Sequence, residues 1–468
     1  MDPEKRARRQ SLRIIISESL MVLAVVTTVA ILAFMVSGYW VNGDFKIERQ
    51  GMLQISSLPT GADVFIDGET AWNQRTNTSK VLTSGEHTIE LKKEGYDTWS
   101  RTVSIAEGLL YRVHYPRLFL KEREKSKVLD LSSANFATIS PNREQALIAN
   151  NTTEWQIVDL TREELKPSTI DVSSLFTSVS MAPGATKGLF NGKIQSADWS
   201  TGNERVLIKA TVDDGYEWVI VDTKNSTESI NITKIFNADF TNISITDNSA
   251  TSLLAILDHN LHKINLSSRQ ISAVLAENVI DYDFYESEIV FSAVSGLDKT
   301  DSEYYVGLLK NHGDSPEIIT KLDTKPLVTL LRFYDDSYIS ILKDGELSIF
   351  EKNSKKPFMD GTIDQEVKSF SVGHAGEFQT AVSGRDITTI DMEAKSIVQW
   401  QTESDFNWLD SDMIYTVQDG DLIVYDYDGL NRRVISKNVS DHFPVTITND
   451  KWLYYVSDDQ LVREIISD

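Results

Sequence analysis

The chain contains 468 residues, of which 41% are hydrophobic and 9% aromatic, so it can build folded cores and is not a disordered protein. It carries 46 basic and 69 acidic residues, a net charge of −23, which argues against a nucleic-acid-binding protein. It has no cysteine, which excludes disulfides, zinc held by thiolates, iron–sulfur clusters, a thiol nucleophile and an anchor on an acylated cysteine.

The N-terminus pairs a basic segment, residues 1–19, with an uncharged apolar run from Leu20 to Trp40. As a helix, this run spans about 30 Å, the hydrocarbon thickness of a bilayer. Five basic residues precede it, whereas Asp44 and Glu48 follow it, so the positive-inside rule predicts a cytoplasmic N-terminus. We therefore expect one transmembrane helix at 20–40, which contacts the membrane through Leu20 to Trp40, with the rest of the chain extracytoplasmic.

The sequence disfavours two alternatives to an uncleaved anchor. A cleaved signal peptide has an apolar region of about 7–15 residues and a small-x-small cleavage site, whereas this run is longer and Val36-Ser37-Gly38 is a poor site. A buried soluble helix is disfavoured because no charge interrupts the run. A large exported region without cysteine favours a prokaryotic cell envelope, which is the location that we predict.

Residues 51–120 alternate apolar and polar side chains with a period of two. Turn residues, such as Asp67-Gly68 and Ser84-Gly85, separate the alternating stretches. Five short antiparallel strands in about 70 residues predict a small β-sandwich. The strands are expected near residues 53–55, 62–66, 89–91, 103–105 and 111–115.

Two separated strings in this segment resemble the PEGA domain. Residues 57–69 read SLPTGADVFIDGE, close to the pattern S-x-P-x-G-A-x-V-x-[IV]-D-G, and residues 84–99 read SGEHTIELKKEGYDTW. Thr60 stands where the name-giving motif has Glu. The resemblance implies a small extracytoplasmic module of bacterial and archaeal surface proteins, without enzymatic activity, that acts as a spacer or a binding module.

Beyond a charged connector at 121–127, the chain becomes acidic and repetitive. Residues 128–468 hold 28 basic and 54 acidic side chains. Segments 140–160 and 200–222 share a turn, a β-branched strand, a polar loop and a second strand that ends in Asp. Weaker copies continue to the C-terminus and give eight strand–turn–strand units of about 43 residues, with one longer gap around 182–191.

Four-stranded units of that length are typical of a β-propeller. The last unit supplies three strands, and the strand at 127–131 is expected to complete it, which would remove an exposed edge. We predict a mostly β protein with an N-terminal transmembrane helix, a PEGA-like sandwich at 51–120 and a propeller at 127–468. The predicted number of blades is eight, with seven as the alternative. The phrase SPN-x-E-x-ALI resembles TolB-type and WD-repeat propellers in general, a fold that implies no particular function.

The candidate motifs for chemistry have structural interpretations. His259 and His262 are three residues apart, an odd spacing that does not put both on one strand face, and the Glu of HExxH is missing. Asp419-Gly420-Asp421 and Asp426 to Gly429 lack the full calcium-loop spacing and predict hairpin turns. We predict no catalytic, cofactor-binding or metal-binding residues. Six tryptophans are expected to pack within blades, with one or two at a channel mouth as candidates to stack on sugar rings: Trp155, Trp199, Trp218, Trp400, Trp408 and Trp452.

The predicted function is non-catalytic: a membrane-anchored interaction or scaffold protein that binds an envelope protein or cell-wall glycan through its propeller, and not nucleic acid. The alternative is a glycan-acting enzyme that uses carboxylates in the central funnel. Buried carboxylates with a raised pKa beside an exposed tryptophan would favour the enzyme, and an apolar plug would favour the scaffold.

Overall fold

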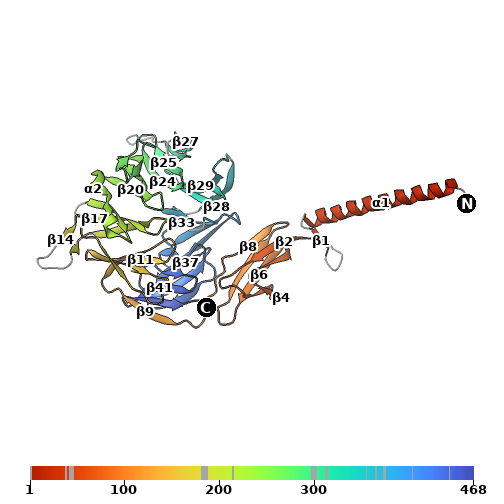
Figure 1. The fold of residues 1–468 in the computed structure, drawn as a ribbon, viewed down its shortest axis with the longest axis horizontal. Coiled ribbons are helices and arrows are strands. Elements are labelled where there is room, and N and C mark those ends of the chain that lie inside the picture. The colour runs from red at the N-terminus through yellow and green to blue at the C-terminus, as the bar shows by residue number, and fades with distance from the viewer. Residues whose placement is uncertain are drawn as a thin grey trace. The chain divides into compact units, whose positions relative to one another are not determined.

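The chain begins with a long helix, α1 (Pro3–Val36), followed by a short strand, β1 (Tyr39–Val41) (Figure 1). The computed structural model describes residues 3–468 except 37–38, 42–46, 181–187, 213–214, 297–302, 311–314, 355, 364–365, 373–375, 403 and 442. The chain divides into two compact units, residues 1–122 and 123–468.

Within α1, the segment Ile16–Ala33 is long and apolar enough to cross a membrane, and its side chains are exposed. Its two threonine hydroxyls are satisfied inside the helix: Thr27 donates to the Leu23 carbonyl at 2.7 Å and Thr28 donates to the Ala24 carbonyl at 2.8 Å. Such internal hydrogen bonds suit a helix in an apolar environment. By length and composition the segment fits a membrane span or a signal sequence.

The prediction that this helix reaches Trp40 is wrong. It ends at Val36, and Tyr39 and Trp40 lie in β1, where they pair with Arg49 and Glu48 of the following strand. Aromatic residues favour strands, and the pairing satisfies backbone groups that an isolated helix end would leave free.

Two four-stranded sheets form the rest of the first unit. Their strands are β2 (Ile47–Ile55), β3 (Asp63–Ile66), β4 (Glu69–Arg75), β5 (Thr78–Thr83), β6 (Gly85–Lys92), β7 (Trp99–Ile105) and β8 (Leu110–Val113). One sheet has the order β1-β2-β5, with β8 parallel to β2, and the other has the order β4-β3-β6-β7. The prediction of five antiparallel strands is therefore wrong, because β4 and β5 are too polar to alternate clearly and β8 runs parallel to its neighbour.

Alternate side chains of these strands form the core of the sandwich. Leu53 of β2, Ile89 of β6 and Trp99 of β7 are fully buried. Asp67 and Gly68 join β3 to β4 with φ of 55° and 79°, left-handed values that a tight hairpin turn requires. This confirms the predicted turn at Asp67-Gly68.

His87 and Asp67 form a hydrogen-bonded pair on this unit. The Asp67 carboxylate lies 2.7 Å from His87 Nδ1 and accepts the Thr88 N–H at 2.8 Å, while His87 Nε2 lies 2.9 Å from the Thr83 carbonyl oxygen. Burial lowers the pKa of His87, but its hydrogen bonds to Asp67 and Thr83 outweigh this effect and raise the pKa above 6.5. The same hydrogen bond to His87 lowers the pKa of Asp67.

We expect Asp67→Asn to lower the pKa of His87, because the charged acceptor is lost while the Thr83 carbonyl remains. A raised histidine pKa contributes stability that is present below the unfolded value and is lost as the pH rises through the folded value. The variant should therefore be less stable than the wild-type protein near pH 5 to 6, and it should lose little stability near pH 8. An NMR titration of His87 measures the shift, with the exposed Glu69→Gln as the control. An unchanged His87 pKa in Asp67→Asn would contradict this account.

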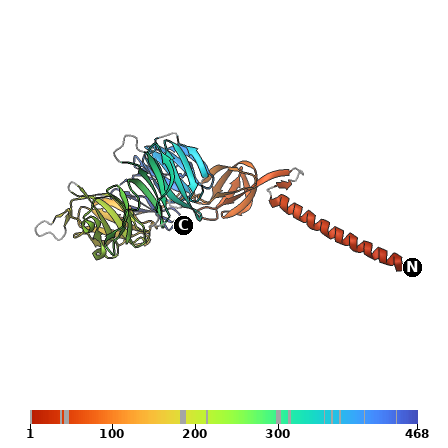
Figure 2. The ribbon, with the colours of Figure 1, turned by 90° about the horizontal axis from the view of Figure 1, so that it is seen from above.

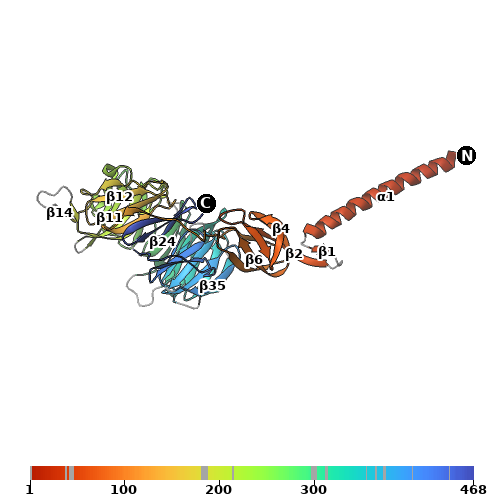
Figure 3. The same cartoon turned by 90° about the horizontal axis from the view of Figure 1, so that it is seen from below.

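In the second unit, eight four-stranded antiparallel sheets follow one another within the described part of the chain (Figure 1). The first four blades are β10 (Ala134–Ile139), β11 (Gln145–Asn150), β12 (Glu154–Asp159), β13 (Ser168–Asp171); β16 (Lys193–Trp199), β17 (Arg205–Val212), β18 (Gly215–Asp222), β19 (Ile230–Asn231); β20 (Phe240–Ile245), β21 (Ser252–Leu257), β22 (Asn260–Asn265), β23 (Gln270–Ile271); and β24 (Val279–Tyr285), β25 (Glu288–Val294), β26 (Tyr304–Leu309), β27 (Glu317–Leu322). Figure 3 shows β11 and β12 side by side.

The remaining blades continue the same antiparallel order, and Figure 2 shows part of them from above in cyan and blue. They are β28 (Leu327–Phe333), β29 (Asp336–Lys343), β30 (Glu346–Glu351), β31 (Pro357–Thr362); β32 (Ser369–Val372), β33 (Phe378–Ser383), β34 (Asp386–Asp391), β35 (Ser396–Gln401); β36 (Phe406–Trp408), β37 (Met413–Gln418), β38 (Asp421–Asp426), β39 (Arg433–Ser436); and β40 (Thr446–Thr448), β41 (Trp452–Ser457), β42 (Gln460–Ile465) with β9 (Lys125–Asp130). The predicted propeller is confirmed, and the described residues form eight blades, the predicted number, rather than the alternative of seven.

Shorter elements occupy the connections between blades. A two-stranded hairpin, β14 (Val179–Ser180) and β15 (Leu189–Phe190), lies in the predicted gap after the first blade. A 3-10 helix, η1 (Ser226–Glu228), precedes β19, and the short helix α2 (Ile232–Phe236) follows it.

The two ends of the propeller sequence meet in the eighth blade. β9 pairs antiparallel with β42, so that Asp130 lies opposite Gln460 and Lys125 lies opposite Glu464. The predicted closing strand is confirmed, with bounds Lys125–Asp130 in place of 127–131. The first and last blades also pack together, since the Tyr454 hydroxyl donates to the Leu160 carbonyl at 2.7 Å.

Four side chains secure this closure, and we term Arg123, Lys125, Tyr455 and Glu464 the latch. The Glu464 carboxylate is fully buried. One of its oxygens accepts from Arg123 Nε at 2.6 Å, and the other lies 2.9 Å from the Tyr455 hydroxyl and 3.4 Å from Lys125 Nζ. The buried charge is therefore paired on both oxygens, as a buried carboxylate requires.

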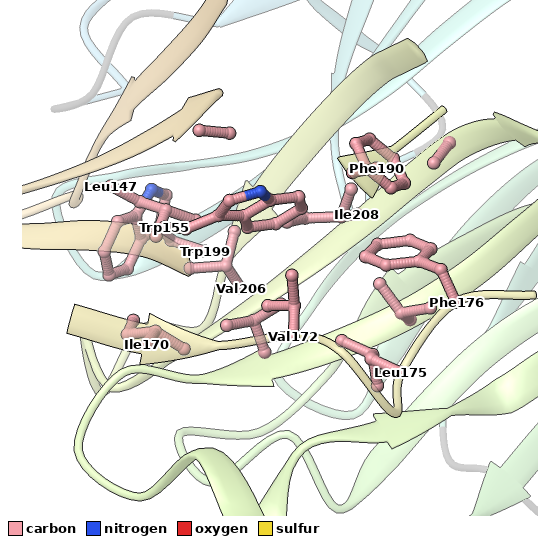
Figure 4. Close-up of a cluster of buried hydrophobic side chains, with 14 residues drawn as sticks. Leu147, Trp155, Ile170, Val172, Leu175, Phe176, Phe190, Trp199, Val206 and Ile208 are labelled. Carbon is pink, nitrogen blue, oxygen red and sulfur yellow. The ribbon is translucent and has the colours of Figure 1, made fainter. Parts of the chain in front are cut away.

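Neighbouring blades enclose apolar clusters. Figure 4 shows the cluster between the first two blades, where Trp155 and Trp199 lie among aliphatic side chains. The rings of Phe176 and Phe190 each lie 5.6 Å from that of Trp155. The sixth and seventh blades meet instead through a stacked aromatic pair, Phe378 and Tyr427, with ring centroids 3.8 Å apart.

The aspartate that ends the third strand of several repeats has a local role. Asp159 accepts the backbone N–H of Thr161 at 3.0 Å, and Asp222 accepts those of Lys224 and Asn225 at 3.0 and 2.8 Å. Each carboxylate therefore caps the turn that follows its strand, which explains why the repeat ends in Asp.

Candidate functional site

The first strand of each blade lines the axis of the ring. In the last blade, β9 pairs with β42 and supplies the fourth strand. The strands of each blade are therefore ordered from the first, which is innermost, to the fourth, which is outermost. First strands of neighbouring blades contact one another, as β16 does with β20, β24 with β28 and β28 with β32. Because strand residues alternate between faces, every second residue of these strands can face the central channel.

Three carboxylates on these first strands have a raised pKa. Burial is the main cause for Asp198 of β16 and for Asp281 and Asp283 of β24. Asp283 accepts the backbone N–H groups of Leu330 at 2.9 Å and Phe284 at 2.8 Å, which oppose the rise, while the nearby charge of Asp281 adds to it. Asp198 is solvent-accessible and yet desolvated by the surrounding protein, as expected on the wall of a channel.

Tyr282 ties this acidic wall to the neighbouring blade. Its hydroxyl lies 3.1 Å from Ser244 Oγ and 3.0 Å from the Leu254 carbonyl oxygen. Burial raises the pKa of Tyr282 far above 10, and the charge of Asp281 adds to the rise. The phenol is therefore neutral at physiological pH and acts as a bridge between the third and fourth blades.

A cavity of about 610 Å³ lies near the strand β36, between the first, seventh and eighth blades, and we term it the larger β36 cavity. Aromatic side chains and polar groups share its wall, and the described residues that line it include no lysine or arginine. Its main side chains are Asn135, Phe136, Asp405, Asn407, Tyr415 and Phe443.

Tyr415 is the most deeply placed polar residue of this wall. It is 6% exposed, and its hydroxyl oxygen accepts the Val445 N–H at 3.1 Å. Burial raises the pKa of Tyr415, so the hydroxyl keeps its proton and can donate it.

A second cavity of about 290 Å³ adjoins the sixth and seventh blades, and we term it the smaller β36 cavity. Asp405 and Asn407 line both cavities, which places these two side chains at the boundary between them. Trp408 lines the smaller cavity, and its indole N–H is buried without a hydrogen-bond partner. Of the six tryptophans singled out in the sequence, Trp408 thus adjoins a cavity, whereas Trp155 is fully buried in blade packing.

A third cavity, of about 300 Å³, lies against the turns of the fourth and fifth blades. Its two basic side chains form ion pairs within the wall: Lys352 with Glu288, and Arg332 with Glu286 at 3.5 Å. Asp335, Asp336 and Glu351 also line this cavity, so its wall is acidic overall and repels anionic ligands.

Of the candidate metal and calcium residues, His259 and Asp419 lie in turns, whereas His262 lies in β22 and Asp421 and Asp426 lie in β38. His259 sits in the turn before β22, and His262 Nδ1 lies 3.0 Å from the Ser272 carbonyl oxygen. Asp419 and Gly420 form the turn between β37 and β38, with φ of 51° and 82°. Among the residues that the structure describes, no group of three or more metal-ligating side chains comes together.

Sequence reasoning missed the acidic wall and the wall of the larger cavity. Asp281 and Asp283 stand two residues apart in the string VIDYDFY, and this alternation was the available signal. It becomes meaningful once β24 is known to be the first strand of a blade. Asn135, Asp405 and Asp441 are far apart in the sequence and meet because the ring closes.

A comparison with known families supports the first part of the architecture. Residues 50–117 match the family model of the PEGA domain. The chain is similar to an oligogalacturonate lyase from Vibrio parahaemolyticus, at 10% identity and a TM-score of 0.39 over 59% of this chain and 91% of that one. It is also similar to the β-propeller domain of Cps50 (Swd1) from Myceliophteria thermophila, at 11% identity and a TM-score of 0.39 over 75% and 99%. Hsv2 from Kluyvelomyces marxianus is similar at 8% identity and a TM-score of 0.40, over 63% of this chain and 92% of that one. No curated protein matches the chain. These likenesses are too weak to carry a function, and the propeller assignment stands on the strand pairings above.

Proposed function

We propose that this protein is a single-pass membrane protein of a prokaryotic cell envelope, with a cytoplasmic N-terminus and a non-catalytic propeller that binds a protein or cell-wall partner. The observation that carries the proposal is the exposed apolar segment Ile16–Ala33 at the start of a chain that continues into a PEGA domain and a closed propeller. An apolar anchor and an acidic, water-soluble head on one chain fit a protein that presents a binding surface at a membrane.

The distribution of charge supports the proposed orientation. Residues 1–40 contain five basic side chains, all of them before the apolar segment. Positive charge is retained on the cytoplasmic side of a membrane, which favours an N-terminus inside the cell. The large acidic region then lies outside, where its self-repulsion keeps it soluble.

Protease protection tests this topology. We expect proteinase K to degrade the PEGA domain and the propeller in intact spheroplasts, and to leave only the N-terminal segment protected. Removal of residues 1–36 should move the protein from the membrane to the soluble fraction, because no other described helix is long and apolar enough to span a bilayer. Full protection of the propeller in spheroplasts would contradict the proposed orientation.

Crosslinking and pull-down from native envelopes test the proposed binding function. One reproducible protein or cell-wall partner, retained by the full chain, is the expected result. Retention on cell-wall glycan with new reducing ends over time would instead make the protein an enzyme.

The acidic wall favours a second candidate, a glycan-acting enzyme. Asp281 and Asp283 share one strand, and both carry a raised pKa, as a proton-donating carboxyl group needs. If this candidate is correct, Asp281→Asn or Asp283→Asn should abolish the release of reducing ends, while Asp336→Asn, at an exposed position, should leave it unchanged.

A further inference from the structure

The polar groups of the larger β36 cavity include both hydrogen-bond donors and acceptors. The Tyr415 hydroxyl already accepts the Val445 N–H, so its own proton is available to a ligand. The exposed Asp405 carboxylate supplies acceptors, and the exposed Asn407 amide supplies one donor group and one acceptor. Hydroxyl groups donate and accept, so a polyhydroxyl ligand can use all three side chains. An ammonium or guanidinium group only donates and would leave the Tyr415 proton unused.

Charge restricts the ligand further. Asp405 lines the cavity, and the described lining residues include no lysine or arginine. The surrounding region, 128–468, holds 54 acidic against 28 basic side chains. Phosphates, sulfates and uronic acids are therefore repelled both at a distance and in contact.

The apolar part of the wall suits a ring with a C–H face. Phe136 comes from the first blade, and Phe443 and Pro444 come from the eighth. Ligand sites typically combine such apolar surfaces with a few fixed polar groups in about 300–1,000 Å³, and this cavity has about 610 Å³.

We infer that the larger β36 cavity binds a neutral saccharide, with Asp405, Asn407 and Tyr415 as the residues that hold its hydroxyl groups. The inference rests on the proposed binding function and names the ligand class for one site of the propeller. Because Asp405 and Asn407 also line the smaller β36 cavity beside Trp408, a second sugar ring extends past these residues toward that cavity. An oligosaccharide should therefore bind more tightly than a monosaccharide.

The test is calorimetric titration of the purified full chain in a detergent without a sugar headgroup. The neutral probes are glucose, maltotriose, cellotriose and triacetylchitotriose, and the charged probes are trigalacturonate and the glucosamine trimer. We expect at least one neutral trisaccharide to bind, more tightly than glucose and more tightly than either charged trimer.

Variants locate the binding. Asp405→Asn and Asn407→Ala should each lower the affinity for the trisaccharide by at least about fivefold, which corresponds to the loss of one hydrogen bond. Tyr415→Phe should act in the same direction, although it also removes the acceptor of the Val445 N–H. Asp419→Asn, which makes the same charge change in an exposed turn of the same blade, is the matched control and should bind normally. Thermal unfolding of each variant verifies that it is folded.

Three outcomes would overturn the inference. The folded protein binds no neutral saccharide, or it binds one equally well in all variants, or it prefers the glucosamine trimer over its acetylated counterpart. None of these affects the crosslinking result, so failure here is distinguishable from failure of the proposed binding function.

Discussion

Replacement of Glu464 by alanine is expected to lower the free energy of unfolding of the propeller by about 3–5 kcal/mol, the cost of removing one partner from a buried ion pair. Glu464 is fully buried and is the acceptor for Arg123 Nε at 2.6 Å. Without it, the guanidinium of Arg123, whose side chain is 14% exposed, keeps its charge and loses the carboxylate that compensates it. The Tyr455 hydroxyl also loses a partner at 2.9 Å.

Urea unfolding of the full chain in detergent, followed by tryptophan fluorescence, measures this loss. The control is Lys127→Ala on the same strand, β9, because the Lys127–Asp458 pair is 3.9 Å apart and exposed on both sides. Exposed pairs contribute little, so the control should change the stability by less than about 1 kcal/mol. Similar losses in both variants would show that the latch is no stronger than a surface contact.

The second large effect is expected at Trp155. Trp155→Ala should destabilise the propeller by about 3–5 kcal/mol, because it leaves a large cavity between the first two blades. The indole is fully buried, lies against Phe176 and Phe190, and donates its N–H to the Thr152 carbonyl at 3.1 Å (Figure 4).

Trp408→Ala is the informative comparison for this prediction. Trp408 is half-buried and its indole N–H has no hydrogen-bond partner, so truncation should cost clearly less than at Trp155. Urea unfolding monitored by far-UV circular dichroism avoids the loss of a fluorophore. Equal destabilisation by the two substitutions would mean that burial between blades is not what stabilises the ring.

The propeller could be predicted because its signals are local and repeated. Strands such as EWQIVD and EWVIVD carry their own alternation, and Asp159 and Asp222 mark the turns that they cap. The closing strand β9 could be predicted because a three-stranded last unit leaves an edge that needs a partner. The PEGA strings were specific for the same reason: Asp67-Gly68 fixes a hairpin by turn chemistry.

The features that escaped prediction depend on contacts between distant parts of the chain. β8 pairs with β2 in parallel, a register that no local pattern encodes. Asp198 is an ordinary strand residue until the ring places it on the channel wall, where the surrounding protein raises its pKa. The wall of the larger β36 cavity joins Asn135 to Asp441, and only closure of the ring brings them together.

The position of the latch has a mechanical consequence for a tethered protein. If a partner holds the propeller while the N-terminal helix is fixed in a membrane, tension enters the ring through the residues that precede β9. Arg123 precedes β9 along the chain. A pull on the N-terminal side therefore loads the Arg123–Glu464 ion pair before it loads the hydrogen bonds between β9 and β42. The buried ion pair is thus placed where peeling would begin, ahead of the ladder hydrogen bonds of β9.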